Sequence, residues 1–171
     1  MSSSATLIIM RHGKADQSSP TGKDRDRPLL PIGTENTVAC AHALARMFGT
    51  SLRVVSSEYV RAHETADIMM RTWKRATSEV IVDSTFNSDN AIDPMIDRLR
   101  GYLDEPTVVV SHMPQVAEMV EIVTASTASL LFKPGAFVVI ELENMARLRG
   151  TIATFLTPST IRRVLQAREA K

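Results

Sequence analysis

Cysteine is almost absent from this chain of 171 residues, which contains only Cys40. A single cysteine excludes an internal disulfide, and it excludes zinc or iron–sulfur sites built from clustered cysteines. Such sparing use of cysteine is typical of proteins that work in a reducing compartment. We therefore expect a cytoplasmic protein.

Long apolar runs and an excess of charge of one sign are also missing. The first apolar run, Leu7 to Met10, has no basic segment before it and is too short for a signal peptide. No stretch approaches the ~20 apolar residues that span a bilayer. The 20 Lys and Arg residues nearly balance the 19 Asp and Glu residues. We expect neither a membrane nor a nucleic acid as partner.

The chain is long enough to bury a core without disulfides or metals, since 44% of its residues are hydrophobic. Its length predicts a single domain over residues 1–171. Within it, we expect residues 1–5 to be flexible and residues 158–171 to form a C-terminal helix.

Short apolar runs alternate along the chain with amphipathic segments. The runs predict strands, and apolar residues three or four positions apart predict helices between them. Strands with continuous apolar centres are typical of a parallel sheet that is covered on both faces. We predict a three-layer α/β/α fold whose mostly parallel central sheet carries an antiparallel edge strand. The expected strands are residues 6–10, 53–57, 79–83, 107–111, 136–142 and 151–156; the expected helices are residues 33–48, 62–73, 92–103, 114–123 and 158–171, the last with Ile161, Val164 and Leu165.

Polar side chains follow three of the predicted strands. Arg11, His12 and Gly13 end the first strand, Ser57 and then Arg61 follow the second, and His112 follows the fourth. Ligands of open α/β sheets bind beyond the carboxyl ends of the strands. We therefore expect two histidines and two arginines to converge there.

This set of residues suits a phosphoryl group. Arginines offer forked donors for its oxygens, and a helix N-terminus adds backbone N–H groups. One histidine must be neutral to attack phosphorus, and cationic neighbours favour its neutral form. Ser57 could bind phosphate or cap the helix that follows it. A zinc site formed by His12, His112 and a loop aspartate is an alternative, but it would leave two arginines facing a cation.

Three stretches resemble the histidine phosphatase superfamily. They are Leu7–Ala15, which includes the RHG motif, Val54–Thr65 and Val108–Pro114. The RHGKA form of the motif and the Asp26–Leu29 segment are most similar to SixA-type phosphohistidine phosphatases. The resemblance covers about Leu7 to Leu142 and implies a phosphoglycerate mutase-like fold.

The resemblance implies a role for each residue at the strand ends. It implies that His12 is the nucleophile, that Arg11 and Arg61 clamp the phosphate, and that His112 is the second histidine of the pocket. Gly13 and Ser57 are expected as further phosphate contacts. Neither a metal nor a cofactor is expected.

The sequence departs from the family pattern after the third strand. Many larger members carry a glutamate there as general acid, but Val82–Asn87 contains no carboxylate at the corresponding position. An alcohol of pKa ~16 needs a proton to leave, whereas imidazole, with pKa ~6.5, leaves readily once protonated. The departure favours protein phosphohistidine as substrate. Other possible acids are Asp16, Asp24, Asp26 and Asp89.

Two alternatives to a phosphohistidine phosphatase remain. One is a phosphatase for small phosphomonoesters, and the other is a catalytically silent module that binds phosphate or a phosphoprotein. A serine hydrolase is disfavoured because Ser111 lacks the glycines of a nucleophile elbow. The last 27 residues carry six Lys and Arg against one Glu. A solvated helix face explains this basic segment more simply than a docking patch does.

Overall fold

A six-stranded sheet forms the centre of the computed structural model, which describes residues 5–127 and 130–169. The strand order is β3-β2-β4-β1-β5-β6. The predicted flexible N-terminus falls on residues 1–4, which lie outside the described residues, and on Ala5, which begins β1. The strands are β1 (Ala5–Arg11), β2 (Arg53–Ser56), β3 (Ile81–Val82), β4 (Thr107–Ser111), β5 (Phe137–Asn144) and β6 (Arg149–Leu156).

Four neighbouring strands, β3, β2, β4 and β1, run parallel. Their register places Arg11 opposite Ser111, so the segments that follow β1 and β4 leave the sheet side by side. The mostly parallel sheet is confirmed. The reversed strand is β5, which is antiparallel to both of its neighbours and lies one position inside the edge that β6 forms.

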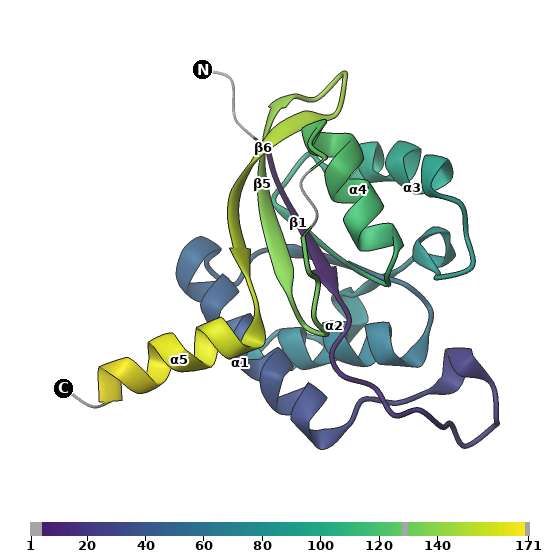
Figure 1. Cartoon of the computed structure of the whole chain (residues 1–171), viewed down its shortest axis with the longest axis vertical. Helices are drawn as coiled ribbons and strands as arrows, with labels where there is room; N and C mark the ends of the chain where they lie inside the picture. Colours follow the sequence, from purple (N-terminus) through teal and green to yellow (C-terminus); the bar gives the residue numbers. More distant parts are fainter. Residues whose placement is uncertain (1–4, 128–129, 170–171) are drawn as a thin grey trace.

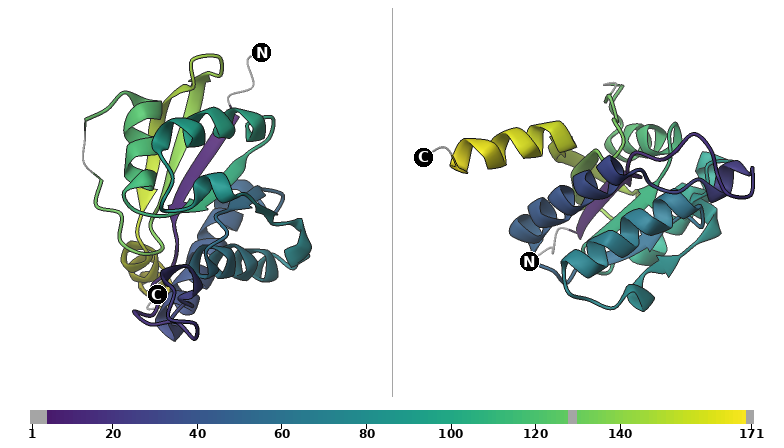
Figure 2. Two further views of the ribbon diagram at one scale, coloured as in Figure 1. Left: turned by 90° about the vertical axis from the view of Figure 1, so that its right-hand side faces the viewer. Right: turned by 90° about the horizontal axis from the view of Figure 1, so that it is seen from below.

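Helices cover both faces of the sheet, which confirms the three-layer α/β/α architecture (Figures 1 and 2). Ile8 and Met10 pack on the face of α1, α2 and α5, whereas Leu7 and Ile9 pack on the face of α3 and α4. Because β1 is buried on both sides, neither of its faces is polar. The helices are α1 (Pro31–Phe48), α2 (Val60–Thr72), α3 (Ile92–Leu99), α4 (Gln115–Thr124) and α5 (Pro158–Glu169).

Some expected boundaries differ from those of the structure. The third strand is short because Thr77–Glu79 forms a turn of 3-10 helix instead of strand. Pro114 caps α4 rather than forming its first residue. Val164 of α5 is 57% exposed, so only part of the predicted apolar stripe is buried. Within residues 5–127 and 130–169, no helix combines the length and apolar character needed to cross a membrane.

The start of α1 packs directly against the chain that follows β1. Leu30 donates its N–H to the Lys14 carbonyl oxygen at 2.9 Å. Gly33 lies so close that a Cβ atom there would be 2.2 Å from the same oxygen. The absence of a side chain at Gly33 therefore lets α1 fix the backbone beyond the end of β1.

We predict that Gly33→Ala destabilises the protein by about 2 kcal/mol or more, because backbone must move to relieve the overlap. Alanine is ordinarily the better helix former by about 1 kcal/mol, so propensity alone predicts the opposite sign. Gly101→Ala is the control, since a Cβ there meets nothing within 4 Å. Urea unfolding measures both changes; equal stability of the two variants would contradict the argument.

Candidate active site

The ends of β1, β2 and β4 bring the four predicted residues into one corner. The rings of His12 and His112 lie with centroids 5.1 Å apart. Arg61, in the first turn of α2, donates from Nε to Nε2 of His12 at 3.2 Å. Arg11 lies close enough for its charge to act on both histidines. His12, Arg61 and His112 are all buried.

The ring of His12 is fixed in one tautomer. Its Nδ1 lies 2.7 Å from the Gly13 carbonyl oxygen, which only accepts, so Nδ1 carries the hydrogen. Nε2 is therefore the nitrogen with a free electron pair. Burial lowers the pKa of His12 well below its usual value, and His112, Arg61 and Arg11 lower it further, against an opposing effect of the Gly13 hydrogen bond. A neutral imidazole is the form able to attack phosphorus.

Arg11 keeps an unused donor at the site. Its Nη1 donates to the Phe132 carbonyl oxygen at 2.7 Å, which anchors the guanidinium. Its Nε is buried and has no hydrogen-bond partner among the described residues. Burial and the charge of Arg61 both lower the pKa of Arg11. An anion at this place would bind the unpaired donor and offset the repulsion.

Gly13 contributes to the site by its small size, and its contact with phosphate stays a prediction. In this structure its N–H donates to Thr65 Oγ1 at 3.0 Å. A Cβ on Gly13 would lie 2.9 Å from Thr37 Oγ1. Thr65, whose hydroxyl also donates to the Arg61 carbonyl oxygen, thus joins the His12 segment to α2.

Ser57 is hydrogen-bonded to neighbouring residues and is not the N-cap of α2, while its contact with phosphate stays a prediction. Its hydroxyl lies 2.8 Å from both Asn87 Oδ1 and His112 Nε2. It also accepts the N–H of Tyr59, which is the N-cap residue itself. The sequence did not point to Asn87, because the Val82–Asn87 segment was considered only for a carboxylate at the position of the family's glutamate.

Among the candidate acids, Asp24 reaches the site. Its carboxylate accepts from Arg61 Nη2 at 3.0 Å, and its carbonyl oxygen accepts from Nη1 at 2.8 Å. Burial alone would raise the pKa of Asp24, but Arg61 and Arg27 lower it overall. An ionised Asp24 is a poor proton donor, and it competes with phosphate for Arg61.

The other candidate acids have different surroundings. Asp16 accepts hydrogen bonds from Ser18, and Asp26 accepts one from Thr21. Asp89 is exposed.

Asp83, which lies in the same connector as Asp89, is buried. Burial raises the pKa of Asp83, but hydrogen bonds from Tyr102, Arg98 and Thr85 lower it strongly overall. The Asp83 carboxylate is thus a structural ionised group.

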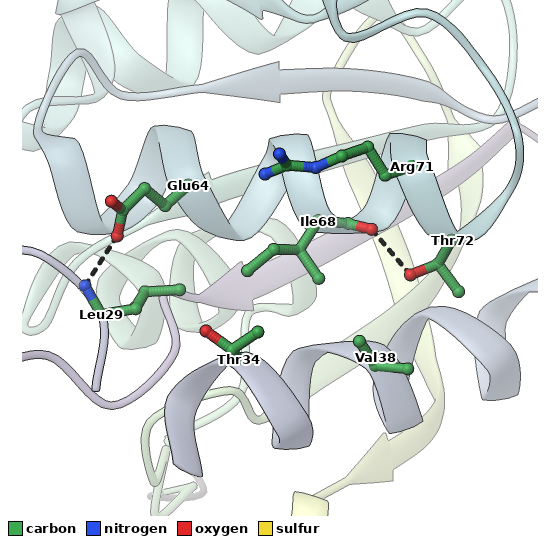
Figure 3. Close-up of a pocket in the computed structure, with 7 residues that line it drawn as sticks. All are labelled: Leu29, Thr34, Val38, Glu64, Ile68, Arg71 and Thr72. Carbon is green, nitrogen blue, oxygen red and sulfur yellow. Dashed lines mark hydrogen bonds between the residues drawn. The ribbon is translucent and has the colours of Figure 1, made fainter. Parts of the chain in front are cut away.

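The long loop after β1 is tied to α2 at its far end. There Glu64 accepts the N–H of Leu29 at 2.7 Å, beside a pocket of about 440 Å³ between α1 and α2 (Figure 3). None of the four site residues lines this pocket, so it is not the catalytic centre. The hydrogen bond between Leu29 and Glu64 beside this pocket holds the loop that carries Asp24.

The zinc alternative lacks ligands. Across the described part of the chain, no three His, Cys, Asp or Glu side chains lie together as a metal site would require. Nδ1 of His12 is engaged with the Gly13 carbonyl oxygen, and a cation at Nε2 would face Arg11 and Arg61.

Residues 7–87 match the family model of the histidine phosphatase superfamily (branch 1). No curated protein matches the chain. The matched segment contains Arg11, His12 and Arg61, whereas His112 lies beyond it.

Solved structures of phosphatases share the fold. The protein histidine phosphatase SixA complexed with tungstate has a TM-score of 0.81 and 21% identity, over 91% of this chain and 99% of that one. A SixA structure from Nakamurella multipartitia has a TM-score of 0.75 and 21% identity, over 92% and 98%. A mycobacterial glucosyl-3-phosphoglycerate phosphatase has a TM-score of 0.67 and 16% identity, over 90% and 99%. The predicted phosphoglycerate mutase-like fold is thereby confirmed.

We predict that Asp24→Ala tightens the binding of inorganic phosphate by about two- to fivefold, because it removes an exposed ion pair that competes for Arg61. Asp26→Ala is the matched control, since Asp26 lies in the same turn of 3-10 helix and contacts Thr21 instead. Inhibition of turnover by phosphate measures the effect. If Asp24 were the general acid, its loss would instead lower kcat, with little change in phosphate affinity.

Proposed function

Since residues 7–87 match the model of the histidine phosphatase superfamily and the fold is that of solved phosphatases, we propose that the chain is a phosphatase of this superfamily that hydrolyses protein phosphohistidine through a covalent intermediate on His12. The observation that carries this proposal is the geometry of His12, whose Nδ1 is bonded to the Gly13 carbonyl oxygen and whose Nε2 lies beside Arg61, with the ring of His112 packed against it. Burial, with the nearby arginine charges, lowers the pKa of His12 and favours its neutral form. Neutral nucleophile and cationic surroundings are the two requirements for attack on a phosphoryl dianion.

The reaction proceeds in two steps. Nε2 of His12 attacks phosphorus in line, and the bond from phosphorus to the leaving nitrogen breaks, with its electron pair going to the leaving imidazole. Water then attacks the phosphohistidine, releases inorganic phosphate and restores neutral His12. Arg11 and Arg61 bind the phosphoryl oxygens in both steps. Arg61 must first give up its hydrogen bond to Nε2, because that electron pair forms the new bond.

The surroundings of the site support a nitrogen leaving group. In the connector after β3, the residue hydrogen-bonded to Ser57 is an amide, Asn87, and not the carboxylic acid that an alkoxide leaving group would need. Asp24 is held ionised by Arg61 and Arg27. Imidazole, with pKa ~6.5, needs a far weaker acid than an alcohol does. We therefore place phosphohistidine ahead of sugar phosphates as substrate and assign no metal to the mechanism.

A basic pocket beside the site supports a protein as the substrate. Lys14, Lys133 and Arg162 line a pocket of about 260 Å³. Its lining lies near the His12 backbone, because Lys14 is two residues from His12, and Gly135, two residues after Lys133, donates its N–H to the His12 carbonyl oxygen. Acidic side chains near the phosphohistidine of a partner protein would complement these charges. The basic C-terminal segment thus contributes one residue to a docking surface, while Arg163 is exposed outside the pocket.

The decisive experiment measures phosphate release from a phosphohistidine peptide and from a sugar phosphate, with and without a chelator. We expect chelator-resistant release from the peptide, and a loss of about 10³-fold or more in His12→Ala. His42→Ala is the control, because His42 is an exposed residue of α1. Faster release from the sugar phosphate would instead indicate a small-molecule phosphatase. Phosphate binding without turnover of either compound would indicate a silent binding module.

Charge reversal in the basic pocket tests the protein partner. We predict that Lys133→Glu and Arg162→Glu each raise KM for a phosphohistidine protein about fivefold, with KM for free phosphohistidine unchanged. Arg163→Glu adds the same charge on the neighbouring residue of α5 and is the control. An equal rise in KM for all three variants would mean that overall charge, and not this pocket, attracts the protein. Unchanged KM values would contradict a role of the pocket in docking.

A further inference from the structure

A chain of hydrogen bonds leads from the surface to His112. The Glu58 carboxylate accepts from Asn87 Nδ2 at 3.0 Å. Asn87 Oδ1 accepts from the Glu58 backbone N–H at 3.0 Å. A carboxylate cannot donate and a backbone N–H cannot accept, so the two contacts together fix which end of the amide is oxygen. The orientation of Asn87 is therefore determined on both sides.

The orientation of Asn87 determines the proton on Ser57. Asn87 Oδ1 can only accept, so the single hydroxyl proton of Ser57 points to it over 2.8 Å. Ser57 Oγ can then only accept a hydrogen bond from the imidazole of His112, whose Nε2 lies 2.8 Å away. His112 must donate from Nε2, and its neutral form carries its hydrogen there.

The other ring nitrogen of His112 remains for a ligand. Nδ1 is buried and has no hydrogen-bond partner in residues 5–127 and 130–169, and the whole residue is 2% exposed. In the neutral Nε2–H form, Nδ1 presents an electron pair, which would repel a phosphoryl oxygen. Binding of a phosphoryl group therefore requires a proton on Nδ1.

We propose that Glu58, Asn87 and Ser57 are positioning residues that hold the Nε2–H tautomer of His112, so that Nδ1 takes up a proton when the phosphoryl group binds and passes it to the leaving nitrogen. This inference rests on the proposed phosphatase function. The leaving imidazole gains the proton as its bond to phosphorus breaks, and His112 becomes neutral. In the second step, Nδ1 accepts a proton from the attacking water.

The charges around His112 explain why the ring takes up a proton only when the phosphoryl group binds. Burial and the positive charges of Arg61, Arg11 and Arg27 lower the pKa of His112 to about 3 in the ligand-free site. The rings of His12 and Tyr59 pack against it, each with centroids 5.1 Å away, and Glu58 acts only through the relay. A phosphoryl dianion offsets the arginine charges and so favours the protonated imidazole.

The tautomer can be tested by long-range 1H–15N correlation spectra of the histidine rings. We expect His112 to carry its hydrogen on Nε2 in the wild type and in Asn87→Asp, which keeps an acceptor for Ser57. We expect a mixture of tautomers in Asn87→Ala, because Ser57 can then donate to the ring. Asn90→Ala is the control, since Asn90 donates to backbone carbonyl oxygens in the same connector. An unchanged tautomer in Asn87→Ala would overturn the positioning role.

Proton uptake can be tested with tungstate, a tetrahedral dianion that carries no proton at neutral pH. Calorimetry in buffers of different ionisation enthalpy should show uptake of about one proton per tungstate in the wild type, and none in His112→Gln. Binding without uptake in the wild type would overturn this inference and leave the phosphatase proposal intact. Failure of tungstate to bind at all would overturn both.

Turnover separates positioning from folding. We expect Asn87→Ala to lower kcat for phosphohistidine about tenfold or more, with a smaller change in KM, because the proton is then poorly placed. Asn87→Asp should recover most of that loss. A fall in kcat that follows thermal stability rather than the fraction of Nε2–H tautomer would overturn the role of the relay.

Discussion

Burial of two arginines at one end of the sheet, with the repulsion between them, is the constraint on which the site depends. Arg11 ends β1 and Arg61 lies in the first turn of α2, so the parallel register of the strands leaves both charges in one partly buried corner. Neither histidine between them can hold a proton easily in the ligand-free protein. Burial, together with the charges of the two arginines, therefore lowers the pKa of His12 and keeps its ring neutral, and the same charges favour the binding of a dianion.

The loop after β1 offsets this repulsion with a carboxylate that a ligand can displace. Asp24 supplies the negative charge that Arg61 lacks, but its side chain is 61% exposed, whereas that of Arg61 is 4% exposed. Because the carboxylate remains solvated, it gains little from this pair, and an incoming phosphoryl group can replace it at small cost. The loop thus occupies Arg61 in the ligand-free protein and can release it to a ligand.

The sequence predicted the fold and the convergence of the four residues because both follow from short-range patterns. Apolar runs mark the strands, and a parallel sheet places the residues after those strands at one edge. Asn87 and Glu58 could not be recognised in this way. Their role depends on hydrogen bonds across 29 and 30 positions of sequence, and on which end of an amide faces which neighbour. Likewise, only side-chain geometry distinguishes Asp24, which contacts Arg61, from Asp26, which contacts Thr21.

The amide at Asn87 links the missing carboxylic acid to the nature of the leaving group. A carboxylic acid in the connector after β3 could protonate an alkoxide, but an amide carries no exchangeable acid of that strength. Asn87 instead directs the proton of Ser57 and, through it, leaves Nδ1 of His112 as the group that titrates. The imidazolium of His112 is a weaker acid than an alkoxide leaving group needs, but its acid strength is similar to that of the imidazole it would protonate. In the proposed mechanism, the connector therefore restricts the leaving group to nitrogen, and the proton for that group comes from His112.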